Sequence, residues 1–247
     1  MSEQNYAPSA FKDHGYVLLK GAISKDSLHD LTRNLWEVVL PRGCQRDTIE
    51  DDILRLEGES HEQVYRASIT LGSSFAAYSL IFKANLRGIA RELLQCAETQ
   101  LHVTPLMTAI QIPGKTEYDY EWHQESSFYP WAPALLNFWF PVLAPTKRGT
   151  GTISLIPGSH KLGRRPESRS GEGKFIQIKP LVTGREESTA LEIEAEPGDL
   201  LVFHADMIHK SIANVSGVPR VTGIVRVIDQ GAMEKPRPLY KSLSYVN

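Results

Sequence analysis

Residues 199–227 read DLLVFHADMIHKSIANVSGVPRVTGIVRV. Three short apolar segments begin in this stretch, at residues 199–204, 210–212 and 220–228, and Gly, Pro, Asn and Asp residues mark the gaps between them. Short apolar segments separated by such turn residues are typical of antiparallel strands. The stretch therefore predicts the C-terminal part of a β-sandwich or a jelly roll.

The same pattern extends back to residue 101. Five further segments read as strands, at residues 101–112, 134–143, 151–156, 174–179 and 190–194. Short strands that follow helices predict a mainly β fold with N-terminal helices. We expect a helical part over about residues 1–100 and a jelly-roll core over about residues 101–230. A length of 247 residues is compatible with a single domain of this class.

The N-terminal part has mixed periodicity. Residues 16–19 read as a strand, Ser24 is a plausible N-cap, and a helix is expected to follow until Pro41 stops it. The apolar stripe of that helix is Leu28, Leu31, Leu35 and Val38. Residues 42–62 are polar, and we expect a loop there. A second helical region is expected over residues 73–97. Its stripe is Leu86, Ile89, Leu93 and Leu94.

The composition narrows the functional class. Hydrophobic residues make up 41% of the chain and charged residues 23%, which is ordinary for a soluble globular protein. A net charge of −2 argues against a dedicated nucleic-acid binder and against a membrane-surface protein. The two cysteines, Cys44 and Cys96, are too few for a disulfide framework. The first residues lack the apolar segment of a signal peptide, so we expect a cytoplasmic protein. The oligomeric state is left open.

Residues 118–130 read YDYEWHQESSFYP and contain the first candidate site. Residues two apart in an extended chain point to the same face, so His123 and Glu125 would converge. Two histidines and one carboxylate with open positions form the usual site of non-haem Fe(II) oxygenases. A His-x-Glu pair alone is equally compatible with a solvated loop or a buried hydrogen-bonded pair. The flanking aromatic residues could line a substrate pocket or belong to the core; they are Tyr118, Tyr120, Tyr129 and Trp131.

A second candidate lies near residue 214. If residues 214–217 form a four-residue hairpin turn, Ser211 lies opposite Arg220, and His209 lies on the same face. An arginine beside a serine can bind a carboxylate, because the guanidinium makes two charge-assisted hydrogen bonds and the hydroxyl adds a third. The alternative for Arg220 is an ordinary surface position on a strand.

His204 and Asp206 form a competing His-x-Asp pair, and His209 follows them closely. The two residues flank the end of one expected strand. The short gap to His209 leaves no sheet across which a facial triad could form. We therefore interpret His204 and Asp206 either as structural residues or as residues that support the metal ligands without binding the metal.

Several motifs occur in a characteristic order along most of the chain. They are Gly15-Tyr16-Val17, Trp122-His123-Gln124-Glu125, Trp139-x-Pro141, GTGTISLIPGSH at residues 149–160, Gly198-Asp199, His209-x-Ser211-x-x-Asn214 and Arg220. The ordered set resembles the phytanoyl-CoA dioxygenase (PhyH-like) family of Fe(II)/2-oxoglutarate oxygenases. The resemblance implies a double-stranded β-helix, the jelly-roll core that cupins share. It also implies His123, Glu125 and His209 as the catalytic iron ligands.

The resemblance further implies a co-substrate site. Arg220 would bind the C5 carboxylate of 2-oxoglutarate, with Ser211 sharing that role. Trp139 matches an aromatic residue that lines the co-substrate pocket, and Met107 falls near another lining position. The family usually has His-x-Asp where this chain has His-x-Glu. Because glutamate is longer by one methylene, the site is either retuned toward a particular substrate or degenerate.

These observations predict an Fe(II)- and 2-oxoglutarate-dependent dioxygenase that uses O₂. It would hydroxylate an unactivated C–H bond of a small molecule and release succinate and CO₂, with ascorbate as the reductant in vitro. The alternatives are a cupin-like metalloenzyme without redox chemistry, such as an isomerase or hydrolase, and a binding domain without turnover. The basic stretch at residues 161–174 is expected to be a loop, either simply solvated or a lid that meets an anionic substrate.

Overall fold

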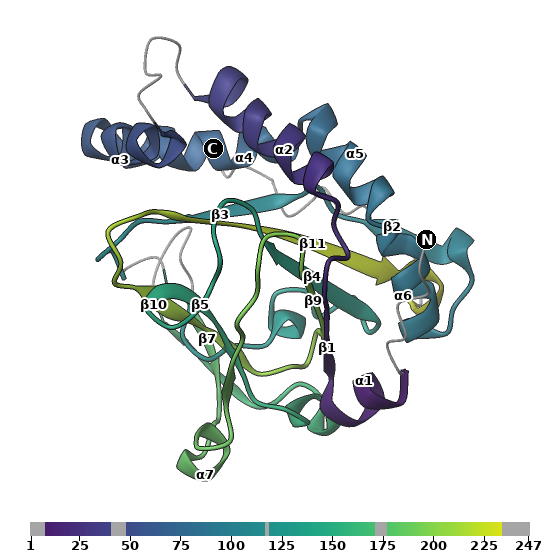
Figure 1. The fold of residues 1–247 in the computed structure, drawn as a ribbon. Coiled ribbons are helices and arrows are strands. Elements are labelled where there is room, and N and C mark those ends of the chain that lie inside the picture. Colours follow the sequence, from purple (N-terminus) through teal and green to yellow (C-terminus); the bar gives the residue numbers. More distant parts are fainter. Residues whose placement is uncertain (1–7, 41–47, 117–118, 171–176, 234–247) are drawn as a thin grey trace, which may run out of the picture.

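The computed structural model describes residues 8–40, 48–116, 119–170 and 177–233. It places a layer of helices on the larger of its two main antiparallel sheets (Figure 1). The larger sheet has the order β1-β9-β4-β11-β2, with β3 also paired to β11. Its strands are β1 (Tyr16–Leu19), β9 (Leu200–His204), β4 (Leu135–Pro141), β11 (Arg220–Asp229), β2 (Leu101–Val103) and β3 (Met107–Gln111). The second sheet contains β10 (His209–Asn214), β5 (Thr150–Leu155) and β8 (Leu191–Glu192).

The two faces of the larger sheet have different partners. Along β4, Leu136, Phe138 and Phe140 are fully buried against the helices. Trp139 points the other way and joins an apolar cluster with Ile153 of the second sheet. Alternate residues of a strand point to opposite faces, so Asn137 shares the Trp139 side. The second sheet therefore packs on the face that the helices leave free.

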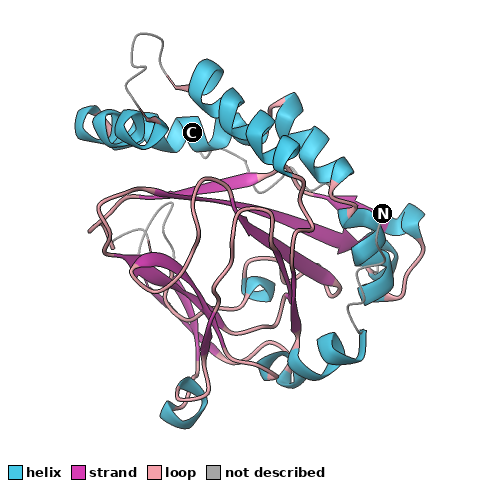
Figure 2. Ribbon diagram, in the orientation of Figure 1, coloured by secondary structure: helices cyan, strands magenta, loops and turns pink. Residues whose placement is uncertain are grey.

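The helical layer covers the opposite face (Figure 2). Its helices are α2 (Lys25–Asn34), which continues as a π-helical turn Leu35–Val39, α3 (Ile49–Glu59), α4 (His61–Gly72), α5 (Phe75–Lys83) and α6 (Leu86–Leu94). A further helix, α1 (Pro8–His14), precedes β1. The expected N-cap is confirmed, because the Ser24 hydroxyl accepts a hydrogen bond from the backbone N–H of Ser27 at 3.2 Å. No helix among the described residues is long and apolar enough to cross a membrane.

The loop expected over residues 42–62 is wrong where the structure describes it. Helix α3 begins after Thr48, whose hydroxyl accepts from the backbone N–H of Asp51 at 3.1 Å. Ile53 and Leu56 are almost completely buried on one face of this helix. The high charge of the segment hid this stripe, although a Thr cap followed by acidic residues is a typical helix start.

The expected helix over residues 73–97 is in fact two helices, α5 and α6. Asn85 between them adopts a left-handed conformation with φ of 53°, which breaks the helical path. The stripe of α6 is confirmed, since Leu86 and Ile89 are buried and its other members pack against the core. Val38 is an error in the first stripe, because its side chain is 69% exposed at the end of the π-helical turn.

Each of the eight segments expected to be strands contains at least one strand, and several are shorter than expected. The segment 101–112 divides into β2 and β3. The basic stretch 161–174 is not wholly a loop. Its start lies in a 3₁₀ turn, Ser159–Leu162, and β6 (Glu167–Ser170) pairs with β7 (Gln177–Pro180) to form a two-stranded arm.

The expected hairpin between β10 and β11 is wrong. Ser211 pairs with Ile153 of β5, whereas Arg220 pairs with Gln111 of β3. The Asn214 side chain does close a turn by donating to the Val218 carbonyl at 2.8 Å. However, β11 already has β4 on one edge and β2 and β3 on the other, so β10 joins the second sheet instead.

Candidate active site

A backbone bridge brings the two histidines of the site together. The His123 N–H donates to the His209 carbonyl at 2.9 Å, and the His209 N–H donates to the His123 carbonyl at 3.0 Å. Their rings lie on the same side, with centroids 4.0 Å apart. The segment before β4 thus runs along the edge of β10, where the Ser211 N–H also donates to the Tyr120 carbonyl at 2.8 Å.

Glu125 completes a cluster with these histidines. Gln124 has extended backbone angles, φ −121° and ψ 136°, so the side chains on either side of it share one face. One potential ligand atom from each of His123, Glu125 and His209 lies within 4.8 Å of the other two. All three residues are buried. Two imidazoles and a carboxylate at this separation can bind one divalent transition metal with coordination positions left open.

Backbone carbonyls fix the tautomers of both imidazoles. The Nδ1 atom of His123 lies 2.7 Å from the Glu121 carbonyl, and the Nδ1 atom of His209 lies 2.9 Å from the Met207 carbonyl. A carbonyl oxygen only accepts hydrogen bonds, so each Nδ1 carries the proton. The Nε2 lone pairs therefore remain free for a metal.

Burial also keeps these imidazoles neutral. It lowers the pKa of His123 and holds the pKa of His209 well below its usual value, and repulsion between the two rings when both are protonated lowers the latter further. A neutral imidazole is the form that binds a metal. The donor set therefore fits Fe(II) without a preceding deprotonation near neutral pH.

Gln124 anchors the same segment from the opposite side. Its fully buried amide donates to the Gly163 carbonyl at 3.0 Å and to the Asp206 carbonyl at 2.7 Å. Its oxygen accepts from the Arg165 backbone N–H at 2.9 Å. The sequence analysis missed this role. The alternation of His, Gln and Glu in an extended segment was the available signal.

Arg220 lies on the inner face of β11, which is the face that the second sheet covers. It is 7% exposed. Its Nε and Nη1 atoms are buried and have no hydrogen-bond partner among the described residues. Burial lowers the pKa of Arg220 to about 10, although the Asp119 carboxylate favours the charged form, so the guanidinium stays charged near neutral pH. A buried, charged and unsatisfied guanidinium fits the carboxylate of a bound molecule.

The other residues expected at the co-substrate site occupy both sheets. Ser211 shares its face of β10 with His209, and its hydroxyl accepts from the Tyr120 N–H at 3.3 Å. Trp139 is buried between the sheets. Met107 is 50% exposed on β3, and its sulfur accepts from Nη1 of Arg226 at 3.0 Å.

Arg226 is a site residue that the sequence analysis did not identify. Its Nε donates to Oε1 of Glu125 at 2.8 Å, and both side chains are buried. Burial opposes the charge on Arg226, but Glu125 and neighbouring groups outweigh it and raise the arginine's pKa. The position of Arg226 on the Arg220 face could have been read from the strand period, but its partner is distant in sequence.

Further unsatisfied polar atoms lie on the inner face of the larger sheet. Both polar side-chain atoms of Asn137, the Thr222 hydroxyl and Oε1 of Gln111 are buried without a partner in the described part of the chain. Asn137 faces Arg226 across the β4–β11 ladder. Buried polar groups in native proteins nearly always have partners, so this face fits a polar bound molecule.

The competing pair lies outside the cluster. His204 and Asp206 interact with each other, and the Asp206 N–H donates to Nδ1 of His204 at 3.0 Å. Among the flanking aromatic residues, Tyr120 lies against His123 with ring centroids 5.1 Å apart, and Tyr129 lies beneath the Arg226 guanidinium at 5.2 Å. Trp131 packs beside Tyr129, whereas Tyr118 lies outside the described residues.

Within the basic stretch 161–174, the Arg165 side chain makes contacts inside the protein and is not a free cation on the surface. This arginine donates to the Leu181 carbonyl at 3.0 Å and to Glu186 of the short helix α7 (Gly184–Glu187). The same helix accepts from Trp122, next to His123, at 2.9 Å through Glu187. Arg164 remains exposed.

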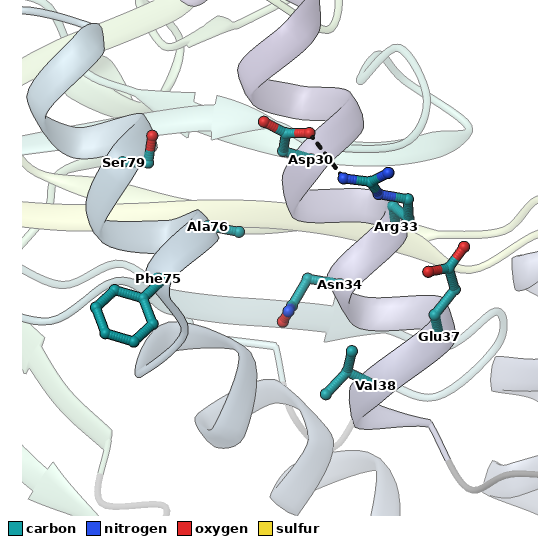
Figure 3. A pocket seen from close by; sticks show the side chains of 8 residues that line it. All are labelled: Asp30, Arg33, Asn34, Glu37, Val38, Phe75, Ala76 and Ser79. Atoms are coloured by element: carbon teal, nitrogen blue, oxygen red, sulfur yellow. Dashed lines mark hydrogen bonds and ion pairs between the residues drawn. The ribbon is translucent and has the colours of Figure 1, made fainter.

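A surface groove of about 400 Å³ lies in the helical layer, between α2 and α5 (Figure 3). Phe75 and Val38 line it together with the Asp30–Arg33 ion pair. Because α2 and α5 cover the outer face of the larger sheet, the groove is separate from the histidine cluster on the inner side.

Comparison with known proteins identifies relatives of this chain. The family model for phytanoyl-CoA dioxygenase (PhyH) matches residues 11–222. The chain is 24% identical over 214 residues to 1-deoxypentalenic acid 11-beta-hydroxylase of Streptomyces exfoliatus, covering 85% of this chain and 74% of that protein.

Two solved structures share the fold. One is EctD from S. alaskensis with 2-oxoglutarate and 5-hydroxyectoine, at a TM-score of 0.64 and 18% identity over 98% of this chain and 81% of that one. The other is EvdO2 from Micromonospora carbonacea var. aurantiaca complexed with 2-oxoglutarate, at a TM-score of 0.63 and 15% identity over 96% of both chains.

Proposed function

The chain belongs to the phytanoyl-CoA dioxygenase (PhyH) family, and we propose that His123, Glu125 and His209 bind the catalytic Fe(II) of this Fe(II)- and 2-oxoglutarate-dependent dioxygenase. The observation that carries the assignment is the buried cluster, in which both imidazoles have Nε2 free and Glu125 supplies the negative charge. We also propose that residues 1–247 form one domain, in which the two facing sheets are the double-stranded β-helix.

Arg220 is the proposed anchor for 2-oxoglutarate. Its Nε and Nη1 atoms have no hydrogen-bond partner in the described part of the chain, and a carboxylate of 2-oxoglutarate would accept from them. Ser211, on the facing sheet, adds a hydroxyl donor to the same carboxylate. Trp139 and Met107 form the walls of this pocket.

When bound, iron and 2-oxoglutarate supply the oxidising chemistry, in which 2-oxoglutarate becomes succinate and CO₂ while one oxygen atom of O₂ enters a substrate C–H bond. The protein orients the reactants and excludes water from them. The buried histidines stay neutral, and an apolar cluster around Trp139 packs between the sheets.

The alternatives explain the site less well. A non-redox metalloenzyme has no use for a buried arginine that binds a carboxylate, whereas a 2-oxoglutarate enzyme requires one. A binding domain would keep such an arginine, so turnover is what separates it from an enzyme. The relatives are named for small-molecule substrates, so we expect a small molecule here as well. The compounds in their names, 1-deoxypentalenic acid and ectoine, are the first to test.

The test is substrate-dependent succinate formation. Purified protein with Fe(II), ascorbate, 2-oxoglutarate and O₂ is screened against a metabolite library that contains these two compounds. We expect succinate above the background to accompany one or a few compounds, with a product heavier by one oxygen atom. No succinate with any compound, together with no binding of 2-oxoglutarate, would favour the binding-domain alternative.

A further inference from the structure

The Glu125 carboxylate has a cationic partner as well as two histidine neighbours. Nε of Arg226 donates to Oε1 of Glu125 at 2.8 Å, across 101 positions of sequence. The side chains are 9% and 7% exposed, so solvent screens this ion pair little. One carboxylate oxygen is therefore committed to the arginine, and the other, Oε2, is left for a metal.

Arg226 is itself fixed on every side. Its backbone N–H donates to the Thr104 hydroxyl at 3.0 Å, and its carbonyl accepts from the Thr104 N–H at 2.9 Å. Its Nη1 donates to the Met107 sulfur at 3.0 Å, and its guanidinium lies over the Tyr129 ring. A guanidinium supported in this way can impose its own geometry on a carboxylate.

Glu125 needs such support more than an aspartate would. The extra methylene adds one rotatable bond between the backbone and the carboxylate, so the ligand atom can occupy more positions. Freezing a flexible side chain on metal binding costs conformational entropy. An arginine that holds the carboxylate beforehand removes part of that cost, as hydrogen-bonded partners of metal ligands generally do.

We propose that Arg226 is a positioning residue, which holds Oε1 of Glu125 so that Oε2 faces the metal between His123 and His209. The inference rests on the function proposed above. It also explains how a His-x-Glu pair can form the site, because Arg226 fixes the longer side chain.

The direction of the effect on metal affinity distinguishes this role from simple electrostatics. A buried cation beside the site repels a divalent metal, so removing its charge alone would strengthen metal binding. Loss of a positioning hydrogen bond would weaken it, by about tenfold to a hundredfold for partners of metal ligands.

The experiment measures the Kd of Mn(II) for the whole apoprotein by calorimetry, which requires neither turnover nor O₂. We expect Arg226→Met to weaken Mn(II) binding by at least about tenfold. Arg226→Lys retains a buried cation but lacks the planar fork, so we expect it to weaken binding by about threefold or more. Thermal unfolding confirms that each variant is folded.

Two further variants separate positioning from a general effect. Arg148→Met removes another arginine that pairs with a glutamate, Glu192, outside the cluster, and should leave the Mn(II) Kd unchanged. Glu125→Asp withdraws the carboxylate by about one bond length, roughly 1.5 Å. In that background Arg226→Met should change the Kd by less than about threefold, because the coupling that a double-mutant cycle measures is already lost.

Unchanged or tighter Mn(II) binding in Arg226→Met overturns the inference. If Arg226→Met does not fold, wild-type affinity in Arg226→Lys overturns it. In either case Mn(II) binding by the wild type leaves the proposed function intact. A wild type that does not bind Mn(II) contradicts the proposed function itself, and this inference with it.

Discussion

Arg220 and Arg226 lie on the same inward face of β11, yet they meet carboxylates differently: Arg226 donates a hydrogen bond to Glu125, whereas Asp119 acts on Arg220 only through its charge. Arg226 is paired with Glu125 at 2.8 Å, whereas Nε and Nη1 of Arg220 are buried without a partner. One strand thus carries two buried guanidinium groups in different states. The proposed functions differ accordingly: Arg226 would position Glu125, and Arg220 would bind the carboxylate of 2-oxoglutarate.

Replacing Arg220 should affect 2-oxoglutarate and leave the metal site intact. We expect Arg220→Ala to weaken 2-oxoglutarate binding by a hundredfold or more, since losing one partner of a buried charge pair costs roughly 3–5 kcal/mol. Arg220→Lys should recover only part of the affinity, because an ammonium cannot make the planar two-point contact. Anaerobic titration of the Fe(II)-loaded protein gives the Kd. Wild-type affinity in Arg220→Ala would place the anchor elsewhere.

Variants of the cluster histidine His209 and of the competing histidine His204 should differ in their iron content. We expect His209→Ala to lose bound iron, because it removes one of three ligands. His204→Ala should retain it, because His204 interacts with Asp206 outside the cluster. Iron content after gel filtration, measured by mass spectrometry, compares the two variants directly. Iron retained in His209→Ala and lost in His204→Ala would reverse the assignment.

Glu186 should remain ionised in unusually acidic solution. Hydrogen bonds from Arg165 and then from Thr183 lower its pKa to about 2. Since the folded pKa is depressed, the contact stabilises the fold fully above about pH 4.5 and is lost as the pH falls toward 2. An NMR titration of the side-chain carboxyl carbon should show Glu186 mostly charged at pH 3. In Arg165→Met the midpoint should move up toward 4.5; an unchanged midpoint would exclude Arg165 as the cause.

Two glycine substitutions test how the helical layer fits the sheet. A Cβ on Gly72, the last residue of α4, would collide with the Leu106 carbonyl oxygen ahead of β3. We expect Gly72→Ala to lower the free energy of unfolding by about 2 kcal/mol, as overpacking does. The matched control is Gly58→Ala in α3, where a Cβ meets nothing within 4 Å. This control should stabilise the protein by up to about 1 kcal/mol. Urea unfolding measures both.

Local sequence patterns predicted where helices and strands form better than which strands pair with one another. The β9 segment could be predicted because it contains four consecutive apolar residues. The convergence of His123 and Glu125 could be predicted because alternate residues of an extended segment share a face. The hairpin between β10 and β11 was wrong because turn length cannot reveal that both edges of β11 are occupied. Strand pairing depends on competition among all strands, which no single segment contains.

The candidate site shows the same division. The histidines and Glu125 were found through spacing and a family resemblance, whereas Arg226 was missed because its contact with Glu125 depends on tertiary structure. Helix α3 was missed for another reason, since its acidic first turn resembled a solvated loop. Charge density at a helix start is itself a helix signal, because carboxylates interact favourably with the N-terminal dipole.

The most direct test of the account is the charge-transfer absorption band that forms when Fe(II) and 2-oxoglutarate bind together without O₂. The account predicts a saturable band in the wild type that requires both components. It also predicts that His209→Ala abolishes the band, and that Arg220→Ala needs much more 2-oxoglutarate to form it. A wild-type protein that binds Fe(II) and gives no band with 2-oxoglutarate would contradict the central claim.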